Sequence, residues 1–121
     1  MEQPSNIAVV VQKAYDWNLW IHPHVHKFSR DYRFSLGQQL LDSSLSLLMH
    51  LVDATYQSRN ATPLSAAMRE VNRLRYLVRL AKDLRVLSLK PAEFAAHHLD
   101  EIGRMTGGWW KSARRTGREA G

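Results

Sequence analysis

Basic side chains recur at helical spacing within the segment RLRYLVRLAKDLRVLSL, residues 73–89. Arg75, Arg79 and Lys82 stand at i, i+4 and i+7, so an α-helix would place them in one stripe. An apolar face gathers beside this stripe at helical periodicity, formed by Leu74, Leu77, Val78, Ala81 and Leu84. Asp83 supplies the only negative charge in the segment. A helix with one apolar face and a row of cations is suited to bind an anionic partner, so the segment points to binding and not to catalysis.

A second strip of the same region mixes cations with one aromatic ring. Arg69, Arg73, Tyr76 and Leu80 fall within a narrow arc of a helix. Acidic residues are too few to neutralise every arginine here, so some positive field should face outward. The planar fork of arginine donates two parallel hydrogen bonds to phosphate. The candidate anion-binding residues are the basic side chains of this region and of the C-terminal region: Arg69, Arg73, Arg75, Arg79, Lys82, Arg85, Lys111, Arg114 and Arg115.

Three histidines, His22, His24 and His26, could suggest a metal site, because the outer two share a helix face. No carboxylate or cysteine stands close in sequence to complete such a site, and Pro23 interrupts the spacing, so surface or interface histidines are the favoured interpretation. The chain also has no glycine-rich phosphate loop, nucleophile elbow or pair of carboxylates beside a base. We therefore expect no metal, no cofactor and no catalytic residue.

Four tryptophans stand in two pairs, Trp17 with Trp20 and Trp109 with Trp110. Core packing accounts for one member of each pair. Since a bundled helix buries one face, the neighbours Trp109 and Trp110 cannot both point inward. An outward tryptophan could seal a subunit interface or stack on a base, and the interface is the preferred interpretation, with all four residues as candidates.

These side chains belong to four apolar-periodic segments. We expect helices over residues 6–29, 36–58, 63–87 and 91–112, followed by a basic, flexible tail over residues 113–121. Pro23 should kink the first helix or divide it in two, whereas Pro63 and Pro91 suit first turns. Ser35 and Gln38 resemble a capping box at the start of the second helix.

No strand-like alternation competes with these helices, and their connections are short enough to favour antiparallel neighbours. The expected fold is an all-α, up-down-up-down antiparallel four-helix bundle. At 121 residues the chain suits a single domain with a core that needs no covalent cross-link.

Composition narrows the choice of partner and compartment. The balance of 17 Lys and Arg against 11 Asp and Glu leaves a formal charge of +6, which favours nucleic acid, acidic proteins or anionic lipid as partners. The chain has no cysteine and no run of 18 apolar residues, so we expect neither disulfides nor a membrane span. The first residues do not read as a signal peptide, and a cytoplasmic location is expected.

Several phrases of the chain resemble the Avd proteins, the accessory variability determinants of diversity-generating retroelements. The similarity is carried by YDWNLW at 15–20, DYRFSLGQQL at 31–40, RLAKDLRVLSL at 79–89 and LDEIGRMTGGWWKS at 99–112. It covers residues 15–112 in the same order and spacing. Avd proteins are themselves similar to the four-helix bundle proteins of 23S rRNA intervening sequences.

The resemblance implies a basic four-helix bundle, without a catalytic site, that assembles into a cyclic homo-oligomer, a pentameric barrel. It also implies association with the reverse transcriptase of the retroelement and with nucleic acid, template RNA or cDNA. Together these would support mutagenic reverse transcription and retrohoming into a variable repeat. What carries over is a basic surface, and no matched set of functional side chains comes with it.

Two other interpretations remain open. One is a stand-alone basic bundle that binds RNA or DNA, like the intervening-sequence proteins. The other is a structural oligomer whose basic face serves only solubility. The diversified gene, the exact subunit count, and the division of the cations between polymerase and nucleic acid do not follow from the sequence.

Overall fold

The chain folds into four long helices and one single-turn helix in the part that the structure describes. The computed structural model describes the backbone of residues 5–57 and 59–120, and the side chains of residues 9–57 and 59–115. The helices are α1 (Ser5–His26), α2 (Arg30–Arg33), α3 (Leu36–Tyr56), α4 (Ala61–Asp83) and α5 (Leu89–Ala120). None of them, over these residues, is both long and apolar enough to cross a membrane.

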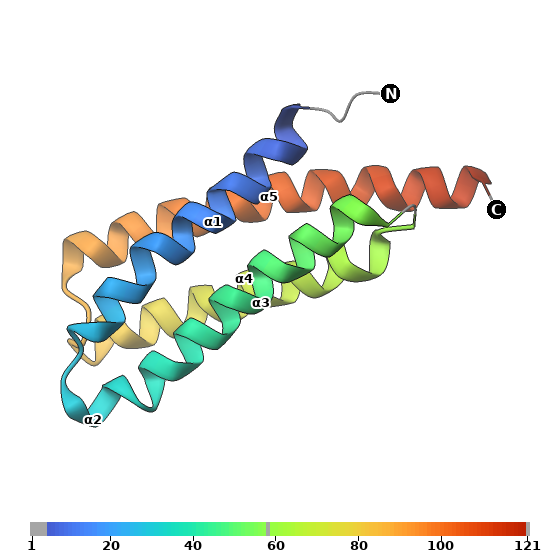
Figure 1. Cartoon of the computed structure of the whole chain (residues 1–121). Coiled ribbons are helices and arrows are strands. Elements are labelled where there is room, and N and C mark those ends of the chain that lie inside the picture. Colours follow the sequence, from blue (N-terminus) through green and yellow to red (C-terminus); the bar gives the residue numbers. More distant parts are fainter. Residues whose placement is uncertain (1–4, 58, 121) are drawn as a thin grey trace.

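The four long helices run antiparallel to their chain neighbours, and α1 begins at the same end of the bundle at which α5 ends (Figure 1). Helix α1 packs against α3, α3 against α4 and α4 against α5, while α1 and α5 close the bundle less extensively. The prediction of a single all-α domain built from four antiparallel helices is confirmed.

Each long helix contributes one apolar stripe to a continuous core. The largest fully buried apolar side chains come from all four helices: Trp17, Ile21, Leu40, Leu47, Leu51, Leu64, Leu74, Leu99 and Ile102. Small residues stand between them where helices approach closely, as Ala14, Ala67 and Ala95 do with no exposed surface. Burial of this apolar surface is the main favourable term that holds the bundle together.

A buried polar contact ties α1 to α3 inside this core. The indole Nε1 of Trp17 donates to the hydroxyl of Ser44 over 2.8 Å, and that hydroxyl donates to the carbonyl of Leu40 over 2.6 Å. The amide nitrogen of Asn18 donates to the carbonyls of Ala14 and Ser44, at 2.9 Å each. Because buried donors need partners, these contacts specify how α1 is seated on α3.

The seam between α1 and α5 is held by a row of aromatic rings. Trp20 lies 5.0 Å from Phe94 and 4.0 Å from the ring of His24, measured between ring centroids. Phe94 in turn lies 5.6 Å from His98. Phe94 remains 48% exposed, so this seam lies partly open to solvent.

The region from Pro23 to Gln38 differs from expectation in the course of α1, in the connection after it and in the start of α3 (Leu36–Tyr56). Helix α1 continues through Pro23 as one helix, so a division into two helices is wrong. Pro23 has no N–H to donate to the carbonyl of Leu19, but it stands in the final turn, and only three helical residues follow it. The polar connection contains the short helix α2. The capping box is absent, because Ser35 donates to the carbonyl of Asp31 and the Gln38 amide donates to Asp42.

Helix α5 is longer than predicted. It begins at Leu89, and it continues to Ala120 where a flexible tail was expected from residue 113, with Gly121 outside the described residues. Six of the eight residues 113–120 are alanine, arginine or glutamate, which are strong helix formers, and the helix extends past the rest of the bundle (Figure 1). The predicted end of the second helix, Ser58, also lies outside the described residues.

Replacing Ser44 by alanine should test the buried contact between α1 and α3. The substitution removes the acceptor of the Trp17 indole and leaves a buried N–H without a partner, which costs about 1–3 kcal/mol. The free energy of unfolding of Ser44→Ala, measured in denaturant, should fall by that amount.

A double-mutant cycle with Trp17→Phe separates the hydrogen bond from packing. Once phenylalanine has removed the indole donor, Ser44→Ala should cost clearly less than in the parent chain. Equal costs in both backgrounds would show that the bond does not stabilise the fold.

Candidate binding surface

The outer arc of helix α4 carries exposed arginines around an exposed tyrosine. Arg69 and Arg73 are exposed, Tyr76 is 70% exposed and Leu80 is 48% exposed. We call these four residues the outer arc. They lie outward because the opposite side of α4 is buried through Val71, Leu74 and Val78.

Both arginines of the outer arc contact neutral side chains. Arg69 Nη1 donates to the Ser65 hydroxyl over 3.4 Å, and Arg73 Nη2 donates to the side-chain oxygen of Gln39 on α3. Neither contact neutralises the guanidinium charge. The outer arc therefore combines positive charge with an accessible aromatic face, the combination that binds phosphates and stacks bases in single-stranded nucleic acid.

Arg75 differs from the other cations of its stripe, because it is committed within the chain. Its Nη2 lies 3.3 Å from Asp100 Oδ1 on α5, and its Nη1 donates to Asn72 Oδ1 over 3.1 Å. The guanidinium passes so close to Gly103 that a β-carbon there would lie 2.7 Å from Nη2. Arg75 is thus a member of the stripe whose charge is neutralised within the chain.

Arg79 and Lys82 keep more of their charge available. Among the side chains that the structure describes, Arg79 has neither an ion pair nor a hydrogen bond with another residue. Lys82 Nζ lies 3.9 Å from Asp83 Oδ1, with both side chains about half exposed. Such an exposed pair contributes little, so Lys82 can exchange Asp83 for another anion.

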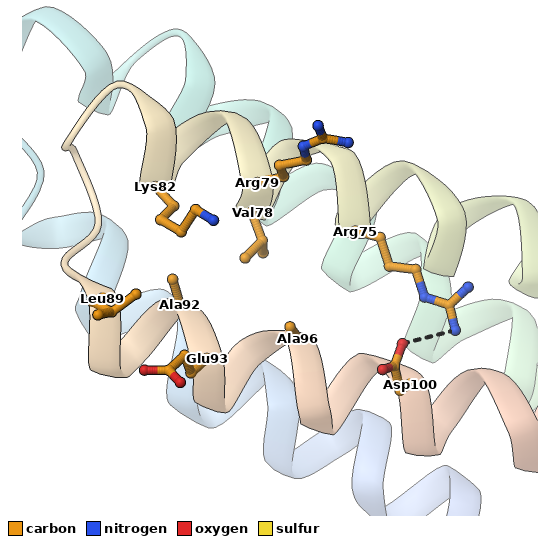
Figure 2. A pocket seen from close by; sticks show the side chains of 9 residues that line it. All are labelled: Arg75, Val78, Arg79, Lys82, Leu89, Ala92, Glu93, Ala96 and Asp100. Carbon is orange, nitrogen blue, oxygen red and sulfur yellow. Dashed lines mark ion pairs between the residues drawn. The ribbon is translucent and has the colours of Figure 1, made fainter.

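These cations border a groove of about 350 Å³ between α4 and α5 (Figure 2). Helix α4 supplies one wall with Arg75, Arg79 and Lys82, and α5 supplies the other with Glu93 and Asp100. The apolar lining between the walls comes from both helices: Val78, Leu89, Ala92 and Ala96. Helix α5 therefore contributes to this groove with residues that the sequence analysis did not select.

Two residues that the sequence placed on the α4 helix, Leu84 and Arg85, lie beyond its end. Helix α4 ends at Asp83, earlier than predicted, so Leu84 lies beyond it and is 43% exposed. Arg85 has a φ of 62°, a left-handed conformation that reverses the chain. The backbone N–H of Val86 then donates a hydrogen bond to the carbonyl of Ala81, which caps the C-terminus of α4. Arg85 is exposed, but it lies in this turn and not in the stripe.

The three C-terminal cations lie apart from the groove, on the part of α5 near its C-terminus. Lys111, Arg114 and Arg115 are exposed, and the guanidinium carbon of Arg114 lies 4.7 Å from the centre of the Trp110 ring. This cation–π contact leaves the charge exposed while covering part of the half-buried indole.

The tryptophans divide differently from the interface prediction. Trp17 has no exposed surface and Trp109 has 8%, so both belong to the core of the protomer, and their assignment to an oligomer interface is corrected. Trp20 and Trp110 are half-buried, and for them the interface stays a prediction.

Large apolar side chains that the sequence analysis did not select are more exposed than any tryptophan. Tyr15 and Leu19 on α1 are 51% and 62% exposed, and Leu45 and Met49 on α3 are 46% and 52% exposed. Each pair is spaced i, i+4, which places its two members on one side of the helix. The sequence pattern did not distinguish these residues from core positions, because they are apolar and stand close in sequence to residues of the buried stripe.

Two histidines contact backbone carbonyls of α1, His24 from within that helix and His98 from α5. Within the described residues, no three side chains of the His, Cys, Asp and Glu types are placed to hold a metal. His24 Nδ1 lies 2.8 Å from the carbonyl of Trp20, and His98 Nε2 lies 3.3 Å from the carbonyl of Lys13. Beside them Lys13 and Glu101 form a 3.0 Å ion pair across the α1–α5 seam, and hydrogen bonding to Lys13 lowers the pKa of Glu101.

Comparison with known proteins supplies a family for this arrangement. A family model described as bAvd-like matches residues 8–113. A solved structure of a protein of unknown function from the S23 ribosomal protein family of Bacteroides thetaiotaomicron is similar in fold, with a TM-score of 0.81 and 18% identity. That match covers 88% of this chain and 98% of the other. Among curated proteins, no match is found.

Glycine at position 85 should stabilise the fold. A left-handed conformation costs a residue with a β-carbon about 1–2 kcal/mol, and glycine avoids that cost while losing some entropy on folding. We expect Arg85→Gly to raise the free energy of unfolding by about 0.5–1 kcal/mol in denaturant titration. Arg85→Val should lower it, since β-branched residues are strained there. A glycine variant less stable than the parent chain would contradict this account of the turn.

Proposed function

The chain belongs to the bAvd-like family, and from this premise we propose that it is a non-enzymatic accessory protein of a diversity-generating retroelement. In this role it binds the reverse transcriptase of the element and its nucleic acid, template RNA or cDNA. It thereby supports mutagenic reverse transcription and retrohoming. Such a role operates in the cytoplasm.

The observation that carries the proposal is the outer arc of α4. Its two arginines contact only neutral side chains among the described residues, and Tyr76 lies exposed between them and Leu80. A surface of this kind binds the nucleic-acid backbone with little sequence preference and offers one ring for stacking. It requires no catalytic group.

We also propose that the chain acts as a cyclic homo-oligomer, a homopentamer as the family resemblance implies. Ring closure requires two different patches that meet around the ring. The exposed apolar side chains of α1 and α3 favour such patches: Tyr15, Leu19, Leu45 and Met49. Oligomerisation would multiply the formal charge of +6 on each subunit, strengthening attraction to RNA and to an acidic surface of the polymerase.

Charge reversal on the outer arc should weaken nucleic-acid binding. With Arg69→Glu and Arg73→Glu combined, affinity for a single-stranded RNA should fall at least about tenfold at low salt. The dependence of binding on salt should also become shallower, because fewer counterions are released on binding when fewer phosphates are contacted. Tyr76→Ala should reduce affinity without changing the salt dependence, because stacking involves no counterion. Fluorescence anisotropy over a range of salt concentrations measures both quantities.

The matched control for charge reversal is Lys90→Glu, which changes one exposed cation of α5 outside both the outer arc and the groove. It should weaken binding only slightly. Equal losses for Lys90→Glu and for either single outer-arc reversal would mean that net charge governs binding and that the outer arc is not a site.

Co-expression with the reverse transcriptase encoded beside the gene tests the accessory role. We expect a stable complex at low salt, recovered through a tag on the polymerase, and a pentamer when the free chain is weighed by native mass spectrometry. Absence of any complex, together with intact RNA binding, would favour a stand-alone nucleic-acid-binding bundle instead.

A further inference from the structure

The groove between α4 and α5 differs chemically from the outer arc, although both use cations of α4. Its lining between the charged walls is aliphatic, through Val78, Leu89, Ala92 and Ala96, and no aromatic residue lines it. Leu89 is 62% exposed, so apolar surface at this end faces solvent. A volume of about 350 Å³ lies at the lower end of the range for binding pockets and can accept aliphatic side chains.

The charges along the groove are arranged asymmetrically (Figure 2). At one end the ion pair between Arg75 and Asp100 joins the two helices. At the other end Lys82 points from α4 toward the space above Val78, while Glu93 lies across from it on α5. Lys82 and Glu93 form no ion pair, and the guanidinium of Arg79 extends over α4, away from α5 (Figure 2). Lys82 is therefore the cation of the α4 wall that an incoming carboxylate can reach from within the groove.

Nucleic acid matches this groove poorly. Phosphates are hydrophilic and would leave the aliphatic lining without a partner, and a base would find no ring on which to stack. A protein segment can satisfy both parts, because aliphatic side chains cover the apolar lining while a neighbouring carboxylate pairs with a cation.

We propose that the groove between α4 and α5 binds an acidic, aliphatic segment of the reverse transcriptase, with aliphatic side chains on Val78 and Ala96 and a carboxylate at Lys82. This inference rests on the proposed function, and it assigns the two partners to different sides of α4. The polymerase occupies the groove, and nucleic acid occupies the outer arc. Arg75 holds the end of the groove through Asp100 and contacts neither partner.

Filling the groove tests the assignment without removing a charge. Ala96 is exposed at the groove, so Ala96→Trp can place an indole over the lining while the core remains intact. The matched control is His97→Trp, which puts the same ring at the next exposed position of α5, turned by about 100°. A second variant, Lys82→Glu, reverses the charge at the α4 wall, with Lys90→Glu as its control.

Each variant is tested as the full chain, first for an unchanged unfolding midpoint and then for two affinities. One is affinity for the reverse transcriptase of the same element, and the other is affinity for a single-stranded RNA oligonucleotide. We expect Ala96→Trp to lose about tenfold or more in polymerase affinity, since it excludes one buried aliphatic side chain of the partner, which is worth that much. We expect a loss of similar size for Lys82→Glu, because the new carboxylate repels the carboxylate of the partner. Ala96→Trp should bind the oligonucleotide as the parent chain does, and His97→Trp should bind both partners normally.

The outcomes separate this inference from the proposed function. Normal polymerase binding by Ala96→Trp overturns the groove assignment and leaves the accessory role in place. Loss of oligonucleotide binding with polymerase binding retained overturns it as well, because the groove would then hold nucleic acid. If the parent chain itself binds no polymerase, the proposed function fails, and the groove assignment fails with it.

Discussion

A helix in a four-helix bundle can bury only one side, and every other property of this protein depends on that constraint. In α4 the buried side is apolar through Val71, Leu74 and Val78. The cations of the same helix must then lie at its edges or on its outer surface, wherever the 3.6-residue repeat places them. Because chain positions three and four apart share a side, one short segment provides a core stripe, a groove wall and an outward basic arc. The core holds the helices, and the helices set the separation of the charges.

Three of the four helix–helix contacts around the bundle differ in the interactions that stabilise them. The contact between α1 and α3 is dry and includes the buried indole of Trp17 with its serine acceptor. The contact between α4 and α5 combines apolar packing with the Arg75–Asp100 ion pair. The guanidinium of Arg75 can lie against α5 because Gly103 has no side chain there. The seam between α1 and α5 depends on half-exposed rings and on the pair between Lys13 and Glu101. Since aromatic and charged contacts at partly exposed positions are weak, this seam is expected to be the least stable wall of the bundle.

The side chains described here suit recognition by charge and shape. Separate surfaces on one helix would let a single small subunit contact a polymerase and its template at the same time. Repetition of the subunit around a ring would add avidity, because several weak sites would act on one long polyanion. In the proposed assignment the groove would supply the specificity, since it would require apolar and acidic groups together, whereas the outer arc would require only phosphate and a base. Charge of this kind also speeds association with an anionic partner.

Apolar periodicity by itself determined the fold class, the number of long helices and the placement of cations along α4, because these depend on local spacing and on which residues prefer water. It also placed Arg69, Arg73 and Tyr76 on one outward arc. Only the tertiary structure decided which arginine is neutralised, since Asp100 comes beside Arg75 when α5 packs on α4, 25 positions further along the chain. The end of α4 at Asp83, with Arg85 left-handed after it, likewise did not follow from the periodicity, which predicted a helix to residue 87. Sequence spacing reports the side of a helix on which a residue lies, and packing alone reports what that side meets.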